Sequence, residues 1–519
     1  MRRSLKVRAL VSILFTGLAV LAAPREALAV TCTWTGGAVD NNWTSPLNWA
    51  IGCSGTGPVA GDDVVFPAGA SRPSPNNNTA NLQINSITIS GNATGNVHYT
   101  INGSTIVIAT TITLSAGPDG LGLGPVINAP LTLGSATTLT NSGGTTAHIG
   151  NIALGGNTLN FNTTTSGSEL TIDGVISGAG LVQKNGAGQV FLMSANTFTG
   201  FLQAFAGTVA NFNQNGLGAA GVGNGTFISS GAALRLHNPG GAYTVAEEMT
   251  LNGNGTGGSD GALYQNDSTI TVTGAIVLSG FTVIRTLTTA SLTLSGPISG
   301  GASILSKQGA GTLILSGNNT FPLIQQDQGT LYLNGNQPNV ETQMASSATF
   351  LGGNGTTGQT AVGVGTVSPG ATAGPAILST GNFTLSGTAT YDVQLAGAAP
   401  GGGYDQLGVT GVVQLGGNLT GALSFAAANG QQFTIINNDG GDAVNGTLNG
   451  VAEGGVINLG GQPFTISYVG GTGNDVVLTY SPLVVPTMPT MMIVLLALAL
   501  AGLAASKLMP ARAPRGSLS

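Results

Sequence analysis

The sequence predicts an all-β protein whose central part is a right-handed β-solenoid. Glycine accounts for 85 of the 519 residues and charged residues for only 6%, and each glycine weakens a helix by roughly 1 kcal/mol relative to alanine. From about residue 81 to 367 the chain is also a succession of short runs in which polar and apolar residues alternate, separated by Gly, Asn and Ser-Gly. Such alternation is typical of strands that place one face in a core.

The first 29 residues have the pattern of a secretory signal peptide. A basic N-terminus precedes an apolar run at 9–23, and Ala29 ends a small-residue cleavage pattern. We expect cleavage after Ala29 and therefore an exported chain.

Residues 30–80 are expected to form an N-terminal cap on the solenoid. The chain's two cysteines, Cys32 and Cys53, both lie there, and in an oxidising compartment we expect them to form a disulfide. Trp34, Trp43 and Trp49 are candidate glycan contacts, because aromatic faces can stack on sugar rings; the alternative is that they form the core of the cap.

The predicted solenoid repeats occupy residues 81–367. Similar short strands recur there at steps of 18 to 21 residues, marked by Leu114, Leu133, Leu154, Ile172 and Leu192. One step would then be one coil of the solenoid, although a meander of antiparallel hairpins would also give regular short strands.

A longer internal repeat supports the stacking of similar units. Lys184 is followed by GAGQVFLMSANTFTG at 186–200, and Lys307 is followed by GAGTLILSGNNTFP at 309–322. The order of features is the same in both copies, so each reads as strand, glycine turn, strand, Asn-rich turn and strand. Stacking such units buries an apolar interior that one unit alone cannot bury.

These segments resemble the autotransporter-associated β-strand repeat of large bacterial surface and secreted proteins. The start, WTGGAVDNNWTSPLNW at 34–49, and the end, YDQLGVTGVVQLGG at 404–417 with ISYVGGTGNDVVLTY at 466–480, are similar to the margins of proteins that carry these repeats. The resemblance covers residues 31–480, densely at both margins. It implies a β-helical, surface-exposed chain that is non-enzymatic or adhesin-like.

A C-terminal β domain is predicted at 368–480, followed by a terminal segment at 481–519. This segment resembles the IPTL-type C-terminal sorting signal of Gram-negative bacteria, which consists of a motif, a helix and a basic end. The resemblance implies sorting by envelope machinery and a link to exopolysaccharide. The motif residues would be Val485, Pro486, Thr487 and Met488.

The same terminal segment is expected to form a single transmembrane helix. The apolar run 491–505, taken with part of its uncharged flank at 483–490, would be long enough to span a bilayer. The basic residues beyond it predict a cytoplasmic C-terminus, with everything before the helix outside.

The charge balance excludes some partners. Residues 30–506 hold 18 acidic and five basic residues, a net charge near −13, so nucleic acid is not expected as a ligand. The basic residues are dispersed, and no known catalytic motif has a convincing context. The histidines, His98, His148 and His237, are also far apart in the sequence.

No catalytic, cofactor-binding or metal-ligating residues are therefore predicted, and the chain is not expected to be an enzyme. A GGxGxD match at 470–475 lacks the adjoining copies that a calcium β-roll requires and reads as a glycine turn. We expect a structural or adhesin-like protein of a Gram-negative cell envelope, sorted and anchored by its C-terminal segment, with polysaccharide as a partner. The alternative is a glycan-binding or carbohydrate-active β-helix protein.

Overall fold

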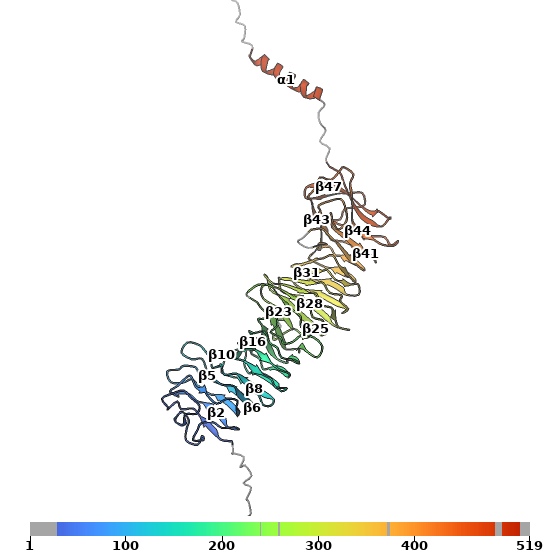
Figure 1. The fold of residues 1–519 in the computed structure, drawn as a ribbon. Coiled ribbons are helices and arrows are strands. Elements are labelled where there is room, and N and C mark those ends of the chain that lie inside the picture. Colours follow the sequence, from blue (N-terminus) through green and yellow to red (C-terminus); the bar gives the residue numbers. More distant parts are fainter. Residues whose placement is uncertain (1–28, 239, 258–259, 371–373, 483–489, 509–519) are drawn as a thin grey trace, which may run out of the picture. The chain divides into compact units, whose positions relative to one another are not determined.

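The computed structural model describes residues 29–482 and 490–508, except 239, 258–259 and 371–373. The signal peptide predicted at 1–29, apart from Ala29, and the sorting motif predicted at 485–488 lie outside the described residues. The chain divides into two compact units, one ending at Leu305 and the other beginning at Ser306. Within each unit, short strands are stacked side by side (Figure 1).

Three ladders of parallel strands run through the first unit, and the chain visits them in turn. Ladder 1 consists of β1 (Thr31–Thr33), β2 (Asp63–Phe66), the second half of β4 (Leu82–Ile89), the second half of β6 (Ile106–Leu114), β9 (Thr137–Asn141), β12 (Thr158–Thr163), β15 (Leu181–Asn185), β17 (Phe201–Ala204), β19 (Gly225–Ile228), β22 (Met249–Gly253), the first part of β25 (Ile276–Thr286) and β27 (Ile298–Ser299).

The other two ladders complete each coil. Ladder 2 consists of β3 (Asn76–Asn77), β5 (Thr100–Gly103), β7 (Val126–Ile127), β10 (Thr146–Ile149), β13 (Glu169–Ile172), β16 (Gln189–Leu192), β18 (Gly207–Asn211), β20 (Ala232–Leu236), β23 (Leu263–Gln265) and the second part of β25. Ladder 3 begins with the first halves of β4 and β6, followed by β8 (Leu131–Leu133), β11 (Ile152–Ala153) and β14 (Ile176–Ser177). On later coils the strands that follow ladder 2 along the chain form a separate parallel ladder. They are β21 (Tyr243–Val245), β24 (Thr269–Val272) and β26 (Ser291–Leu294).

The predicted β-solenoid is confirmed, because strands of successive coils pair in parallel rather than as antiparallel hairpins. Inward positions carry apolar side chains: Leu170, Val190 and Val209, for example, are paired on consecutive coils and almost fully buried. This inward column is what the alternation of polar and apolar residues encodes.

The single register predicted from leucine spacing is wrong. Leu114 lies in ladder 1, where it pairs with Asn141. Leu133 ends a strand of ladder 3, whereas Ile172 and Leu192 pair with each other in ladder 2. The spacing of about 20 residues therefore matches the length of one coil. The leucines counted at this spacing nevertheless lie on different ladders, because inward leucines occur on all three sides of a coil.

The internal repeat encodes a buried lysine in each unit. Lys184 Nζ donates hydrogen bonds to the carbonyls of Asn185, Gly186 and Ala206 at 2.8, 2.7 and 3.0 Å. Lys307 Nζ makes the same pattern with the carbonyls at 308, 309 and 328, at 3.0, 2.7 and 3.0 Å. In each copy the lysine joins its own turn to the turn of the next coil.

A glycine at the following coil leaves room for this ammonium. Gly207 has φ +69°, and a Cβ there would lie 2.6 Å from Lys184 Nζ. Gly329 occupies the same place in the second copy with φ +70°. The Gly-Thr pairs of the repeat thus have a packing reason as well as a conformational one.

Three parallel ladders also run through the second unit. The first consists of β28 (Ile304–Gln308), β30 (Leu323–Gln326), β33 (Glu341–Met344), β36 (Thr360–Val362), β39 (Phe383–Leu385), β42 (Val413–Leu415) and β45 (Asn445–Gly446). The second consists of β29 (Thr312–Leu315), β31 (Gly329–Leu333), β34 (Thr349–Gly352), β37 (Thr366–Val367), β40 (Thr390–Leu395) and β43 (Asn418–Leu423).

The third ladder of this unit changes character at its end. Parallel pairing runs through β32 (Asn336–Gln337), β35 (Thr356–Thr357), β38 (Ile377–Thr380), β41 (Gln406–Val409) and β44 (Gln432–Asn438). Antiparallel pairing follows through β48 (Asp475–Tyr480), β47 (Gln462–Gly470) and β46 (Val456–Leu459). Parallel coils thus continue past residue 367, and the antiparallel strands cover the last of them.

The predicted C-terminal transmembrane helix is wrong. Residues Thr490–Leu508 form the helix α1, but no helix among the described residues is long and apolar enough to cross a membrane. At about 1.5 Å per residue, the apolar run 491–505 is about 22 Å long, shorter than the roughly 30 Å of a hydrocarbon core. The flank at 483–489, which the prediction needed for the missing length, lies outside the described residues.

Candidate functional site

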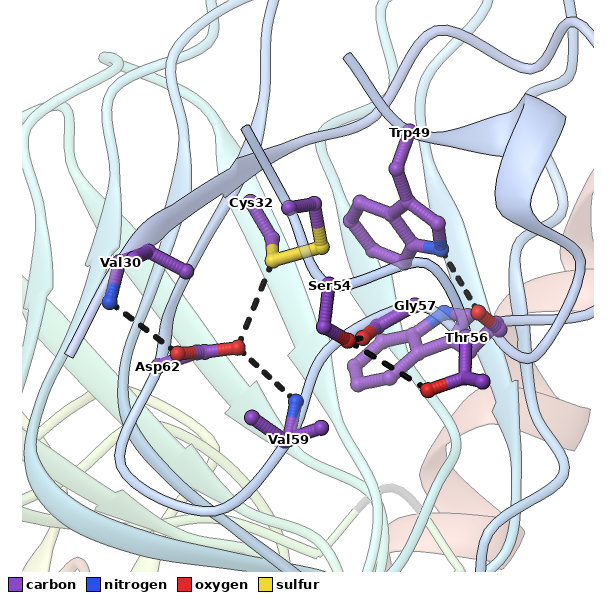
Figure 2. The surroundings of a disulfide bond; sticks show 10 residues. Val30, Cys32, Trp49, Ser54, Thr56, Gly57, Val59 and Asp62 are labelled. Carbon is purple, nitrogen blue, oxygen red and sulfur yellow. Dashed lines mark hydrogen bonds between the residues drawn. A yellow bond between two sulfur atoms is a disulfide. The ribbon is translucent and has the colours of Figure 1, made fainter. Parts of the chain in front are cut away.

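The N-terminal cap is closed by the predicted disulfide between Cys32 and Cys53. Figure 2 shows the Asp62 carboxylate beside this bond, between two main-chain N–H groups. Val59 N donates to Asp62 Oδ2 at 2.9 Å and Val30 N donates to Oδ1 at 3.1 Å. Because the bond consumes both thiols, Asp62 anchors the cap through the main chain and has no thiolate neighbours with which to bind a metal.

The three tryptophans lie inside the cap and do not form a sugar platform. Trp34, Trp43 and Trp49 are 0, 1 and 6% exposed. They pack around Phe66, with ring centroids 6.0 to 6.3 Å from it. A sugar ring needs an exposed aromatic face, so these residues are the core of the cap, as in the alternative considered from the sequence.

The histidines, which are far apart in the sequence, share one role in the fold. Each Nδ1 contacts an aspartate one coil further along the chain: His98 with Asp119 at 2.8 Å, His148 with Asp173 at 2.8 Å, and His237 with Asp267 at 2.7 Å. The hydrogen bond from His98, together with those from the main-chain N–H groups of Leu123 and Leu121, lowers the pKa of Asp119 to about 2. These pairs are separate, so they link coils rather than converge on one reaction centre.

The GGxGxD match forms the hairpin between β47 and β48. Asp475 is 3% exposed, and its oxygens accept hydrogen bonds from Asn438 N at 2.9 Å and Thr472 N at 3.1 Å. The carboxylate is therefore used to hold this turn.

The outward side of ladder 1 carries a continuous column of side chains. Neighbours in this column are hydrogen-bonded between coils: Gln183 donates to Gln203 Oε1 at 3.1 Å, and Asn160 donates to Thr138 Oγ1 at 3.4 Å. The column is polar as far as Gln203, and two of its last three residues are apolar. Its order is Thr111, Thr138, Asn160, Gln183, Gln203, Phe227, Thr250 and Val277.

The apolar end of this column forms the candidate site, a hollow of about 140 Å³ that we call the aromatic hollow. Phe201, Phe227 and Val277 are 46, 37 and 45% exposed around it. Gly225 pairs with Phe201, and a Cβ at Gly225 would lie 3.9 Å from the Phe201 ring and 3.2 Å from Glu248 O. The absence of a side chain there leaves the face of the ladder open.

Two acidic residues beside the hollow have opposite environments. Glu248 is exposed and lines the hollow, so it can accept hydrogen bonds from a bound hydroxyl group. Glu247 is 3% exposed, and burial raises the pKa of its carboxyl group to about 7. Thr226 Oγ1 lies 3.5 Å from Glu247 Oε1. Both residues lie in the connection between β21 and β22, where Glu247 is buried and Glu248 is exposed.

Sequence reasoning missed the aromatic hollow. Its residues come from four consecutive coils, and none belongs to a recognisable motif. The available signal was the set of phenylalanines at outward positions of otherwise polar strands. Comparison with protein-family models and with curated proteins finds no match for this chain.

Proposed function

We propose that this chain is an exported structural or adhesin-like protein of the bacterial cell envelope. The observation that carries the proposal is the outward column of ladder 1, in which regular polar side chains lead to the exposed aromatic hollow. A β-solenoid presents such a column on a stiff support, because every coil is fixed by its neighbours. The Cys32–Cys53 disulfide supports an oxidising compartment outside the cytoplasm.

The two chain ends complete the proposal. The signal pattern at 1–29 would direct export, and the motif at 485–488 would be read by envelope sorting machinery. The resemblance to the autotransporter-associated repeat supports surface display. Under this proposal the chain acts by contact rather than by turnover.

The proposal is tested by adhesion of beads coated with the full chain to bacterial cells and to cell-surface polysaccharide. Replacing Phe201 and Phe227 by serine removes the exposed rings and should reduce bead retention several-fold. Val222→Ser is the matched control, because Val222 is fully exposed and does not line the hollow. Equal retention by all the variants would exclude the hollow as the contact surface.

A second candidate function is glycan binding, and the composition of the hollow favours it. Exposed Phe rings stand there beside Asn224, Thr250 and Glu248, a combination that suits the apolar face and the hydroxyl groups of a sugar. A glycan array read with the same Phe→Ser variants separates this function from a purely structural one. Specific glycan signals that are lost in both Phe201→Ser and Phe227→Ser would favour glycan binding.

A further inference from the structure

A second outward hollow lies on ladder 2 of the first unit, and its chemistry differs from that of the aromatic hollow. It has a volume of about 220 Å³ and is lined mainly by polar side chains. The residues that matter for the argument are Ser166, Gln189, Thr208, Arg235, Asp260 and Tyr264. Gln189 pairs with Thr208, and Arg235 pairs with Tyr264, so strands of adjacent coils build this hollow.

Arg235 is held at this hollow by aromatic rings instead of by acids. Its guanidinium carbon lies 5.4 Å from the Phe191 ring centre and 5.7 Å from that of Phe212. The residue opposite it on the preceding coil is Ala210, whose small side chain lets Arg235 reach Phe191 two coils away. Cation–π contacts of this kind fix the side chain while leaving its donors available.

Those donors are not used within the described part of the chain. The side chain of Arg235 makes no hydrogen bond or ion pair there, and its buried Nε has no partner. Asp260, which also lines the hollow, accepts a hydrogen bond from Thr256 Oγ1. An arginine fixed in place with free donors is a ready receptor for a planar anion, which it binds through two parallel hydrogen bonds.

We propose that this hollow binds the carboxylate of an acidic sugar residue, with Arg235 as its principal contact. Ser166, Gln189 and Thr208 offer hydroxyl and amide groups for sugar hydroxyls, and Asp260 can accept hydrogen bonds from them. The volume is below the ~300–1,000 Å³ of drug-sized sites and suits a single sugar ring.

The charges of the chain restrict the class of acidic ligand further. Residues 30–506 carry a net charge near −13, so a densely charged polyanion is repelled by the rest of the surface. The Asp260 carboxylate also disfavours a doubly charged group such as phosphate. The ligand class is therefore an isolated uronate on an otherwise neutral polysaccharide. This inference rests on the proposed function, because such a polymer is met outside the cell.

The test uses the full chain and two matched probes, a xylo-oligosaccharide bearing one glucuronate and the same oligosaccharide without it. Titration calorimetry should detect binding of the first probe and at least tenfold weaker binding of the second. Arg235→Gln should weaken binding of the acidic probe at least tenfold. Arg235→Lys should recover only part of it, because lysine lacks the planar pair of donors.

Arg285→Gln is the matched control, since Arg285 lies on the same ladder one coil beyond Tyr264 but does not line the hollow. It should bind the acidic probe within twofold of the unchanged chain. Gln189→Ala should weaken binding about threefold, which keeps the test valid if Arg235→Gln fails to fold. Equal binding of the two probes, or equal losses in Arg235→Gln and Arg285→Gln, would overturn the inference. If neither probe binds while the chain is surface-exposed and adhesive, the inference fails but the proposed function stands.

Discussion

Replacing Lys184 by methionine should loosen the coils around the repeat without unfolding the whole unit. Methionine keeps the apolar stem but removes the three hydrogen bonds that Nζ donates to the carbonyls of Asn185, Gly186 and Ala206. The last of these carbonyls belongs to the next coil, so the change removes a link between coils as well as one within a turn.

The size of the effect follows from the number of bonds. Burial lowers the pKa of Lys184 to about 7, so the three bonds are compared at pH 6, where the ammonium is charged. At about 1 kcal/mol net for each hydrogen bond, the loss is about 3 kcal/mol. Since about 1.4 kcal/mol corresponds to a factor of ten, local opening should become on the order of 100-fold more frequent. In a solenoid each coil contacts mainly its neighbours, so this change should stay local.

Hydrogen–deuterium exchange read by mass spectrometry measures this opening. Peptides covering 181–211 should lose protection by about two orders of magnitude, since this is the ratio expected for about 3 kcal/mol, while peptides covering 82–114 should be unchanged. Lys307→Met should have the corresponding effect on peptides covering 307–333. Protection at 181–211 within threefold of that in the unchanged chain would refute the reasoning that the ammonium joins these turns.

Two further predictions concern the first unit. Changing Cys32 and Cys53 together to serine should destabilise the cap by about 3 kcal/mol in the chain-entropy model, seen as lost exchange protection at 31–66 with little change beyond 126; unchanged protection there would contradict it. Burial raises the pKa of the Glu247 carboxyl group from 4.5 to about 7, so the folded chain binds this proton more tightly than the unfolded chain. The resulting contribution to the free energy of unfolding is complete below pH 4.5 and is lost as the pH rises through 7, a decrease of roughly 3 kcal/mol. Glu247→Gln should flatten this pH dependence in exchange measurements at 226–251, whereas Glu248→Gln, an exposed neighbour, should preserve it.

The sequence predicts the solenoid because alternation and coil length follow directly from inward packing. It does not predict which side of a coil a leucine occupies, because Leu133 and Leu192 are equally buried on different ladders. Trp34 and its neighbours could be read as a platform or as a core until their exposure was known. Arg235 and Phe191 could not be paired from the sequence, since their contact requires the register of three coils. The helix α1 was predicted as a membrane span because its flank was included in the length.

Surface display is the central claim, and labelling of intact native cells tests it most directly. An antibody against the first unit, combined with thiol labelling of cells before lysis, reports both exposure and the state of Cys32 and Cys53. We predict that intact cells bind the antibody and that both cysteines resist alkylation until a reductant is added. Antibody binding only after permeabilisation, with both thiols free, would contradict export and the proposed function with it.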